Sequence, residues 1–427
     1  MQQRFSVISL ATALRTSYLP GDTLGGLLVP STLKFVALSL SLLPAGLAYG
    51  QSEASTSSTA PVAYVYVARP THIDGFAASS SGKLTPVPGS PFANTEVTDF
   101  SVTKKFLFGL TANGGGNKLT SYAINSKGSL TKAYSINPAN WQPQDCAAPV
   151  DYPDLQVDST ASTIYVQQSI NCQGEGVEPY LSFHIESNGD MQYLGGSGGY
   201  LDDATQGDTA RLHFISNGKY GYDGECQEDN GNLSDINIYK RGSNGLLSYI
   251  GQSNVVPAPG SNGYPFCAGV LAPDNDNHLA VALQAISGQG GDNGPVFGNW
   301  YLASYTAESN GTLTTKSTAE NMPQVVFAGN YELNAMSIDP TSKFLAVGTF
   351  QGFQIFHFNG SGPITTYSEL LADKTNIQEF GWDKSNHLYA LSSGKLYVYT
   401  VTSSEIKEAS GSPYSIPEST SVIVLDE

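Results

Sequence analysis

Acid–base chemistry at a carbonyl group needs a base that accepts a proton and a cation that stabilises developing negative charge. In this 427-residue sequence the candidate cation is Arg211, which could hold a substrate carboxylate or polarise a carbonyl. The candidate bases are His72, Asp154 and Glu379, and we predict that all four residues are catalytic. Two alternatives stay open: Arg211 forms a structural ion pair with Asp154 or Asp208, and His72 is an ordinary turn residue.

Four more polar residues are predicted to bind a ligand at the same end of the fold: Arg69, Asp99, His213 and Asn334. Arg69 lies in a short segment between two predicted strands. His213 follows Arg211 by two positions, so both side chains point to the same side of an extended strand.

Two acidic segments could supply oxygen ligands to a hard cation such as calcium: LDDATQGD (201–208) and ECQEDNGN (225–232). Neither has the spacing of a known calcium loop, and the alternative is a solvated acidic loop. Asp and Asn in DNDN (274–277) are favoured by a tight turn alone. His278 and His387 lie beside such turns and are assigned structural roles. We predict no metal site and no cofactor, with calcium as the one ion considered.

The four cysteines are Cys146, Cys172, Cys226 and Cys267. An even number in an exported chain predicts two disulfides. Of the three possible connectivities, the pairs 146–172 and 226–267 need the shortest crossings. No Cys-x-x-Cys spacing is present, which disfavours a zinc site.

These candidate residues must be positioned by a repeated unit. Seven times an aromatic residue stands six positions before a turn, and the turn residue is Gly in six cases. Four-stranded antiparallel units of about 40–50 residues, repeated in this way, predict a β-propeller rather than a solenoid with shorter repeats. The seven pairs are Phe76/Gly82, Tyr122/Gly128, Phe183/Gly189, Tyr239/Gly245, Tyr305/Gly311, Phe356/Gly362 and Tyr399/Glu405.

The first unit is incomplete. AYVYVA (63–68), IDGFAAS (73–79) and LTPV (84–87) supply three strands, and the innermost strand is missing. SVIVLDE (421–427) is a lone apolar strand at the other end of the sequence. We therefore predict an all-β fold: a seven-bladed β-propeller with four-stranded antiparallel blades, whose first blade is closed by the C-terminal strand.

Inner strands of a propeller begin at one end of its axis, and binding sites lie there. The longest units are the third to the fifth, so we expect a pocket walled by those blades. The predicted ring of inner-strand starts contains Ser421, Asp99, Asp154, Arg211, Asn334 and Glu379, with Phe266 and Cys267 in the fifth blade.

Residues 1–50 are predicted to be a leader, because KFVALSLSLLPAGLAYG (34–50) has the anatomy of a secretory signal with cleavage after Gly50. Residues 51–61 read as a flexible linker, and residues 62–427 form the propeller. We expect an exported protein, periplasmic or extracellular, with no stable membrane insertion because the apolar run is short.

The net charge of −17 argues against a nucleic-acid partner, since such binding neutralises phosphates with basic side chains. We expect a monomer whose partner is a small molecule, a glycan or a protein.

The seven units, the hairpin GKLTPVPGSPF and its echo GSPY near residue 411 resemble the lactonase-like seven-bladed propellers. That family includes 6-phosphogluconolactonase-like proteins and muconate-lactonising cyclases, and the resemblance covers nearly all of residues 62–427 through scaffold motifs. It implies hydrolysis or closure of a lactone ring at one end of the central channel. The His-Pro pair of the lactonase-type members is absent: the corresponding segments read NAMSIDP and QEFGWD, so no catalytic residue carries over.

Two functions follow as hypotheses. One is an exported hydrolase or isomerase that acts on a lactone or cyclic ester. The other is a non-catalytic envelope propeller that binds a ligand, glycan or protein through the same end. A phosphorylated sugar lactone is disfavoured, because phosphate recognition needs clustered Arg or Lys.

Overall fold

The computed structural model describes residues 60–92, 97–111, 118–141, 151–172, 175–177, 180–197, 211–224, 235–254, 256, 266–287, 296–326 and 333–427. All of them belong to one compact unit, Ser58–Glu427. The predicted leader and nearly all of the predicted linker lie outside this description. In the part described, no helix has the length and apolar character needed to cross a membrane.

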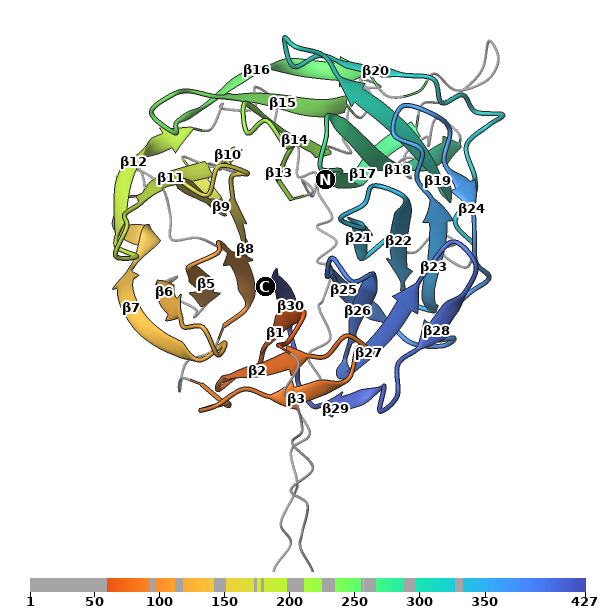
Figure 1. Ribbon diagram of the computed structural model, residues 1–427. Coiled ribbons are helices and arrows are strands. Elements are labelled where there is room, and N and C mark those ends of the chain that lie inside the picture. Colours follow the sequence, from red (N-terminus) through yellow and green to blue (C-terminus); the bar gives the residue numbers. More distant parts are fainter. Residues whose placement is uncertain are drawn as a thin grey trace, which may run out of the picture. The chain divides into compact units, whose positions relative to one another are not determined.

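Seven antiparallel sheets follow one another around a common axis (Figure 1). From the axis outward, blade 1 contains β30 (Ser421–Asp426), β1 (Ala63–Ala68), β2 (Ile73–Ala78) and β3 (Leu84–Pro86). Blade 2 contains β4 (Asp99–Val102), β5 (Phe106–Thr111), β6 (Lys118–Ile124) and β7 (Leu130–Ile136), followed by the short 3-10 helix η1 (Pro138–Trp141). Blade 3 contains β8 (Asp151–Val157), β9 (Thr163–Cys172), β11 (Tyr180–Ile185) and β12 (Met191–Ser197), with β10 (Glu175–Val177) paired to the end of β9.

Blade 4 contains β13 (His213–Phe214), β14 (Tyr220–Gly224), β15 (Asp235–Arg241) and β16 (Leu247–Asn254). Blade 5 contains β17 (Phe266–Pro273), β18 (His278–Ser287), β19 (Val296–Ala307) and β20 (Leu313–Thr315). Blade 6 contains β21 (Ala335–Ile338), β22 (Phe344–Thr349), β23 (Gly352–His357) and β24 (Thr365–Thr366). Blade 7 contains β25 (Ile377–Trp382), β26 (His387–Ser392), β27 (Gly394–Val401) and β28 (Ile406–Glu408), and β29 (Tyr414–Ile416) also pairs with β27.

The predicted closure of the first blade is confirmed. β30 pairs with β1 in antiparallel register from Ala63–Asp426 to Ala68–Ser421. Every residue of β1 is buried, which explains its continuous apolar sequence. The seven-bladed fold predicted from the repeat is therefore the fold observed.

The aromatic–glycine spacing has a physical cause at the borders between blades. At several borders the turn glycine of one blade packs against a residue at the start of the second strand of the preceding blade. A Cβ at Gly189 would lie 2.6 Å from the Phe106 ring, and Gly189 also has a positive φ of 89°. Gly311 is approached by Tyr220 in the same way, and its carbonyl accepts a 2.9 Å hydrogen bond from the Tyr222 hydroxyl. Glycine is needed here for both conformation and space.

The core is distributed over these borders. In one cluster Tyr389 and Leu391 of blade 7 pack with Val65 and Val67 of blade 1. Because each apolar cluster draws on neighbouring blades, the blades bury their faces only as a closed ring.

The inner strands of blades 3, 5, 6 and 7 each end at a buried aspartate: Asp158, Asp274, Asp339 and Asp383. The Asp339 carboxylate accepts backbone N–H bonds from Lys343 at 2.7 Å and Phe344 at 2.6 Å. These aspartates fix the turn into the second strand. They lie at the opposite end of the inner strands from the predicted site.

Candidate functional site

Four of the predicted site residues meet at the axis, where the inner strands begin. Asp99 is the first residue of β4, Asp154 lies in β8 and Glu379 lies in β25. Arg211 stands two residues before β13. We call Asp99, Asp154, Arg211 and Glu379 the axial cluster; the strands β8, β13, β25 and β30 face the centre of the ring (Figure 1).

Arg211 of blade 4 contacts all three carboxylates. Its Nη2 lies 3.1 Å from Asp99 Oδ1, its Nε lies 3.1 Å from Asp154 Oδ1, and its Nη1 lies 3.2 Å from Glu379 Oε1. The carboxylates come from blades 2, 3 and 7, so the guanidinium spans the axis. The alternative pair with Asp154 is thus present, whereas Asp208 lies outside the described residues. The Arg211 side chain is still 48% exposed.

Two of the carboxylates also join neighbouring inner strands. Asp99 Oδ2 accepts a 2.8 Å bond from the Leu155 N–H of blade 3. Glu379 Oε2 accepts a 2.6 Å bond from the Val422 N–H of blade 1. These bonds fix both carboxylates, which in turn orient the guanidinium.

Proton affinities in the axial cluster are strongly shifted. Burial raises the pKa of Asp154 to about 7; the neighbouring Asp99 adds to the rise, and Arg211 opposes it. Burial likewise raises the pKa of Glu379, against Arg211. The three carboxylates, Asp99 first, raise the pKa of Arg211 further above its ordinary value. The pKa of Asp154 therefore lies near neutral pH.

His213, the first residue of β13, lies next to this cluster. Burial, and then the charge of Arg211, lower the pKa of His213 to about 4. The imidazole is neutral at physiological pH and adds no second positive charge.

Two buried polar atoms where the inner strands begin make no hydrogen bond within the described part of the chain, Gln378 Oε1 and Ser421 Oγ, while Asp154 Oδ1 has its ion pair with Arg211 Nε as its one contact there. Gln378 lies at a β-bulge of β25, between Ile377 and Glu379. Ser421 was expected in the ring of inner-strand starts, whereas Gln378 was missed, because a bulge leaves no mark in the alternation of residues. Buried polar atoms without partners normally bind water or a ligand.

The remaining predicted residues do not join the axial cluster. Arg69 and His72 form a separate group around Asp74 on the β1–β2 turn: Arg69 Nη1 lies 3.4 Å and His72 Nε2 lies 3.5 Å from its carboxylate. His72 Nδ1 is also 2.9 Å from the Thr71 hydroxyl. These side chains therefore hold one another in the turn.

Asn334, just before β21, bridges blades 6 and 7. Its Nδ2 donates to Asn376 Oδ1 at 2.6 Å and to the Ile377 carbonyl at 2.9 Å. In this structure Asn334 ties two blades together rather than facing the axial cluster.

Sequence reasoning missed a buried polar pair at the border of blades 3 and 4. The Tyr180 hydroxyl donates to Asp223 Oδ2, and both residues are almost fully buried. Tyr180 lies opposite Gln167, which in turn lies opposite Asp154. A polar row thus leads outward from the axial cluster. An aspartate inside the apolar strand YGYDG (220–224) was the available signal.

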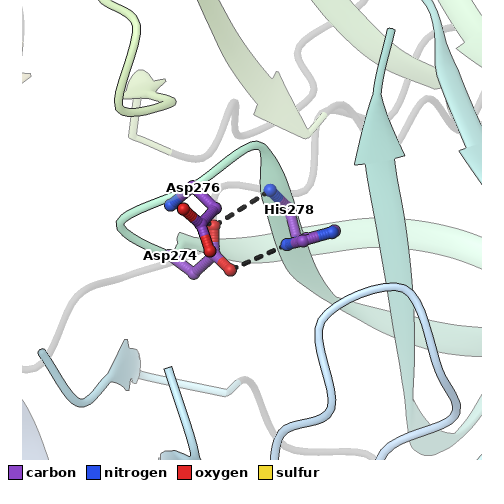
Figure 2. Close-up of side chains that lie close together, drawn as sticks. All are labelled: Asp274, Asp276 and His278. Carbon is purple, nitrogen blue, oxygen red and sulfur yellow. Dashed lines mark hydrogen bonds and ion pairs between the residues drawn. The ribbon is translucent and has the colours of Figure 1, made fainter. Parts of the chain in front are cut away.

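At the opposite end, Asp274, Asp276 and His278 lie close enough to be tested as metal ligands (Figure 2). Asp274 Oδ1 accepts N–H bonds from Asp276 at 2.8 Å and His278 at 3.0 Å, and its Oδ2 lies 2.8 Å from His278 Nδ1. Blade 7 repeats this arrangement with Asp383 and His387. We therefore interpret the group as a turn shared by blades and not as a metal centre.

Several predicted features lie outside the described residues. These are Cys146, Cys226 and the acidic segments 201–208 and 225–232. Cys172 ends β9, and its side chain is not described, while Cys267 is buried near the start of β17. The disulfide pairing and the calcium alternative stay predictions.

No protein-family model matches the chain. No curated protein matches it either. Among solved structures, it is similar to a candidate 6-phosphogluconolactonase from Bacteroides uniformis ATCC 8492, with a TM-score of 0.57, 13% identity, and coverage of 85% of this chain and 99% of the other. It is also similar to a functionally unknown protein from Desulfotomaculum acetoxidans DSM 771, with a TM-score of 0.54, 12% identity and the same coverage. At these identities the likeness shows the fold alone: the chain has the scaffold of the lactonase-like propellers.

Proposed function

We propose that the chain hydrolyses or isomerises a lactone or a related cyclic ester at the axial cluster, with Asp154 as the group that transfers the proton. The observation that carries the proposal is the buried Asp154 carboxyl, which lies beside Arg211. Burial raises the pKa of Asp154 to about 7. A carboxyl with such a pKa accepts and returns protons readily at neutral pH. The scaffold likeness supports the substrate class by analogy only.

Arg211 keeps hydrogen-bonding capacity for a substrate. A guanidinium has five N–H donors, and its three nitrogens each contact one carboxylate here. Each Nη therefore has a second N–H to offer, and the side chain is half-exposed. These N–H groups would stabilise the negative charge that develops on the carbonyl oxygen.

In the hydrolytic step, water adds to the carbonyl carbon and its proton passes to Asp154. The ring C–O bond then breaks, the ring oxygen takes up the proton, and a hydroxy acid leaves. Asp99 and Glu379 act as positioning residues, since backbone N–H groups already hold them. His72, predicted as a base, takes no part in this step.

A lactone-hydrolysis panel on the full chain tests the proposal. Asp154→Asn should lower kcat/KM at least about 100-fold, the usual scale for losing a general base. The wild-type rate should rise with pH through about 7 as Asp154 ionises. Asp190→Asn, at a partly exposed position between β11 and β12 of blade 3, is the matched control and should keep full activity. Full activity in Asp154→Asn would exclude its role.

The second candidate function is a non-catalytic propeller that binds a ligand, glycan or protein at this end. It is favoured by the way Arg211 joins blades 2, 3, 4 and 7, which is a structural task. Saturable ligand binding without turnover of any lactone would select it.

We also propose that the protein is exported and carries the disulfides 146–172 and 226–267. Close approach of neighbouring backbone supports the second pair: a Cβ at Gly224, two residues before Cys226, would meet the carbonyl of Gly269, two residues after Cys267. Non-reducing peptide mapping decides the matter, and a 146–226 or 146–267 peptide would refute the pairing.

A further inference from the structure

The axial cluster has more negative than positive groups. Three carboxylates surround one guanidinium, and His213 beside it is neutral because burial and Arg211 lower its pKa to about 4. Within the described part of the chain, no other ion pair reaches Asp99, Asp154 or Glu379. When all three carboxyls are ionised, Arg211 therefore leaves the cluster with a deficit of positive charge.

The unpartnered atoms point to the same kind of ligand. Gln378 Oε1 can only accept a hydrogen bond, and the oxygen of the Ser421 hydroxyl, which lies beside Glu379, can accept as well. Ser421 is 1% exposed and directly precedes Val422, whose N–H binds Glu379. These oxygens form a second observation, independent of the charge count, that calls for a donor.

A ligand of this site should add positive charge and donate hydrogen bonds to the acceptor oxygens, and ligand classes differ in whether they do so. An anion adds negative charge and brings acceptors, so it does neither. A neutral hydroxyl group donates to the oxygens but leaves the charge uncompensated. An ammonium group donates and adds the missing charge, and attraction between charges is several times stronger at such a partly buried site than in bulk water. The net charge of −17 also favours the approach of cations.

We infer that the axial cluster takes a positively charged ligand: a lactone or cyclic ester that carries an ammonium substituent. The ring follows from the proposed function, whereas the charge follows from the axial cluster itself. Such a cation would stabilise ionised Asp154, so its binding should tighten as pH rises through about 7, where Asp154 loses its proton. Asp99, Asp154, Glu379, Arg211 and His213 are the titratable and charged groups that face the ligand there.

The test uses three γ-butyrolactones with the same short side arm, ending in a primary ammonium, a hydroxyl or a carboxylate. None of the three changes charge between pH 6 and pH 8. Calorimetry on the full chain should show the cation binding at least about tenfold more tightly than the neutral analogue, a difference of roughly 1.4 kcal/mol. The carboxylate should bind weakest, and the preference for the cation should shrink as salt screens the charges.

Two variants and one control locate the effect. Glu379→Gln and Asp99→Asn should each cut the preference about tenfold, the loss expected for roughly 1.4 kcal/mol of charge interaction. Asp190→Asn removes the same charge at a partly exposed position of blade 3 and should leave the preference unchanged. Salt dependence of the wild type needs no variant, so a folding defect in either substitution does not remove the test.

The outcomes separate this inference from the proposed function. Binding of the cationic lactone without hydrolysis keeps the inference and rejects the lactonase proposal. Hydrolysis with equal use of the three analogues, or with a preference for the carboxylate, overturns the inference and leaves the lactonase proposal standing. Binding of none of the three overturns the inference outright.

Discussion

The turn of blade 7 and the axial cluster both contain buried acidic side chains, at opposite ends of the inner strands. The two regions differ in the number of hydrogen-bond donors around each carboxylate. Asp383 Oδ1 accepts N–H bonds from Ser385 and His387, both at 2.9 Å. Asp383 Oδ2 lies 2.7 Å from His387 Nδ1 and accepts a 2.8 Å bond from the Tyr389 hydroxyl. Every oxygen of this aspartate has a fixed partner.

In the axial cluster, Asp154 is also buried, but it has fewer hydrogen-bond donors around it. Its Oδ1 lies 3.1 Å from Arg211 Nε but makes no hydrogen bond of good geometry in the region described. Burial is therefore not balanced, and the pKa of Asp154 rises to about 7. Both carboxylates are buried, so the donors around them, and not burial, separate a structural acid from one available for chemistry.

The largest expected effect is a loss of stability when the turn aspartate of blade 7 is replaced. Asp383→Ala should lower the free energy of unfolding by roughly 3–5 kcal/mol, because buried His387 and Tyr389 lose their partner. Asp154→Asn keeps the shape of the side chain and removes an unfavourable buried charge, so it should cost less than about 1 kcal/mol at pH 7.5. Urea unfolding of both variants measures the contrast, and equal losses would break it.

The second effect concerns pH. Because the pKa of Asp154 is raised from 3.8 to about 7 in the folded protein, the stability linked to it is present below pH 4 and lost as pH rises to about 7. Asp154→Asn should remove that loss, which amounts to no more than roughly 4 kcal/mol.

His213 works in the opposite direction over part of the same range. Its lowered pKa makes stability rise between about pH 4 and pH 6.5. The quantity to follow in urea titrations is therefore the difference between Asp154→Asn and wild type, in which the contribution of His213 cancels. A difference that stays constant from pH 4 to pH 8 would show that Asp154 titrates normally.

The smallest expected effect tests the turn of blade 5. Asp276 contributes backbone groups to this turn, and its side chain is exposed, so Asp276→Asn should change stability by less than about 0.5 kcal/mol. Calcium, zinc and a chelator should leave the melting temperature of the wild type unchanged. A metal-dependent rise that Asp276→Asn abolishes would turn this group from a structural turn into a binding site.

The fold could be predicted because its signals are local and repeated. The glycine six positions after an aromatic marks a contact between neighbouring blades at several borders, as Phe106 against Gly189 shows. The missing strand of blade 1 then required a donor, and β30 supplies it. Placing Asp99, Asp154, Arg211 and Glu379 at one end of the axis followed from the blade count.

The partners of Arg211 could not be selected in the same way. Arg211 lies 168 positions from Glu379 and 112 from Asp99, and its contacts cross the axis. Their distances depend on the tilt of each inner strand and on the direction of each side chain, which no local pattern encodes. The sequence left Asp154 and Asp208 as alternatives and did not propose Asp99 or Glu379 as ion-pair partners. The bulge that places Gln378 was likewise invisible.

The pairing of β30 with β1 also has a consequence for biosynthesis. The hydrogen bond from Thr420 to Ala68 at the start of this pairing joins residues 352 positions apart. When the ribosome has synthesised the second to seventh blades, it has not yet released β30, the strand that covers β1. Until then the apolar edge of β1 is open to strands of other molecules. The nascent protein is thus most exposed to misassembly just before the ring closes.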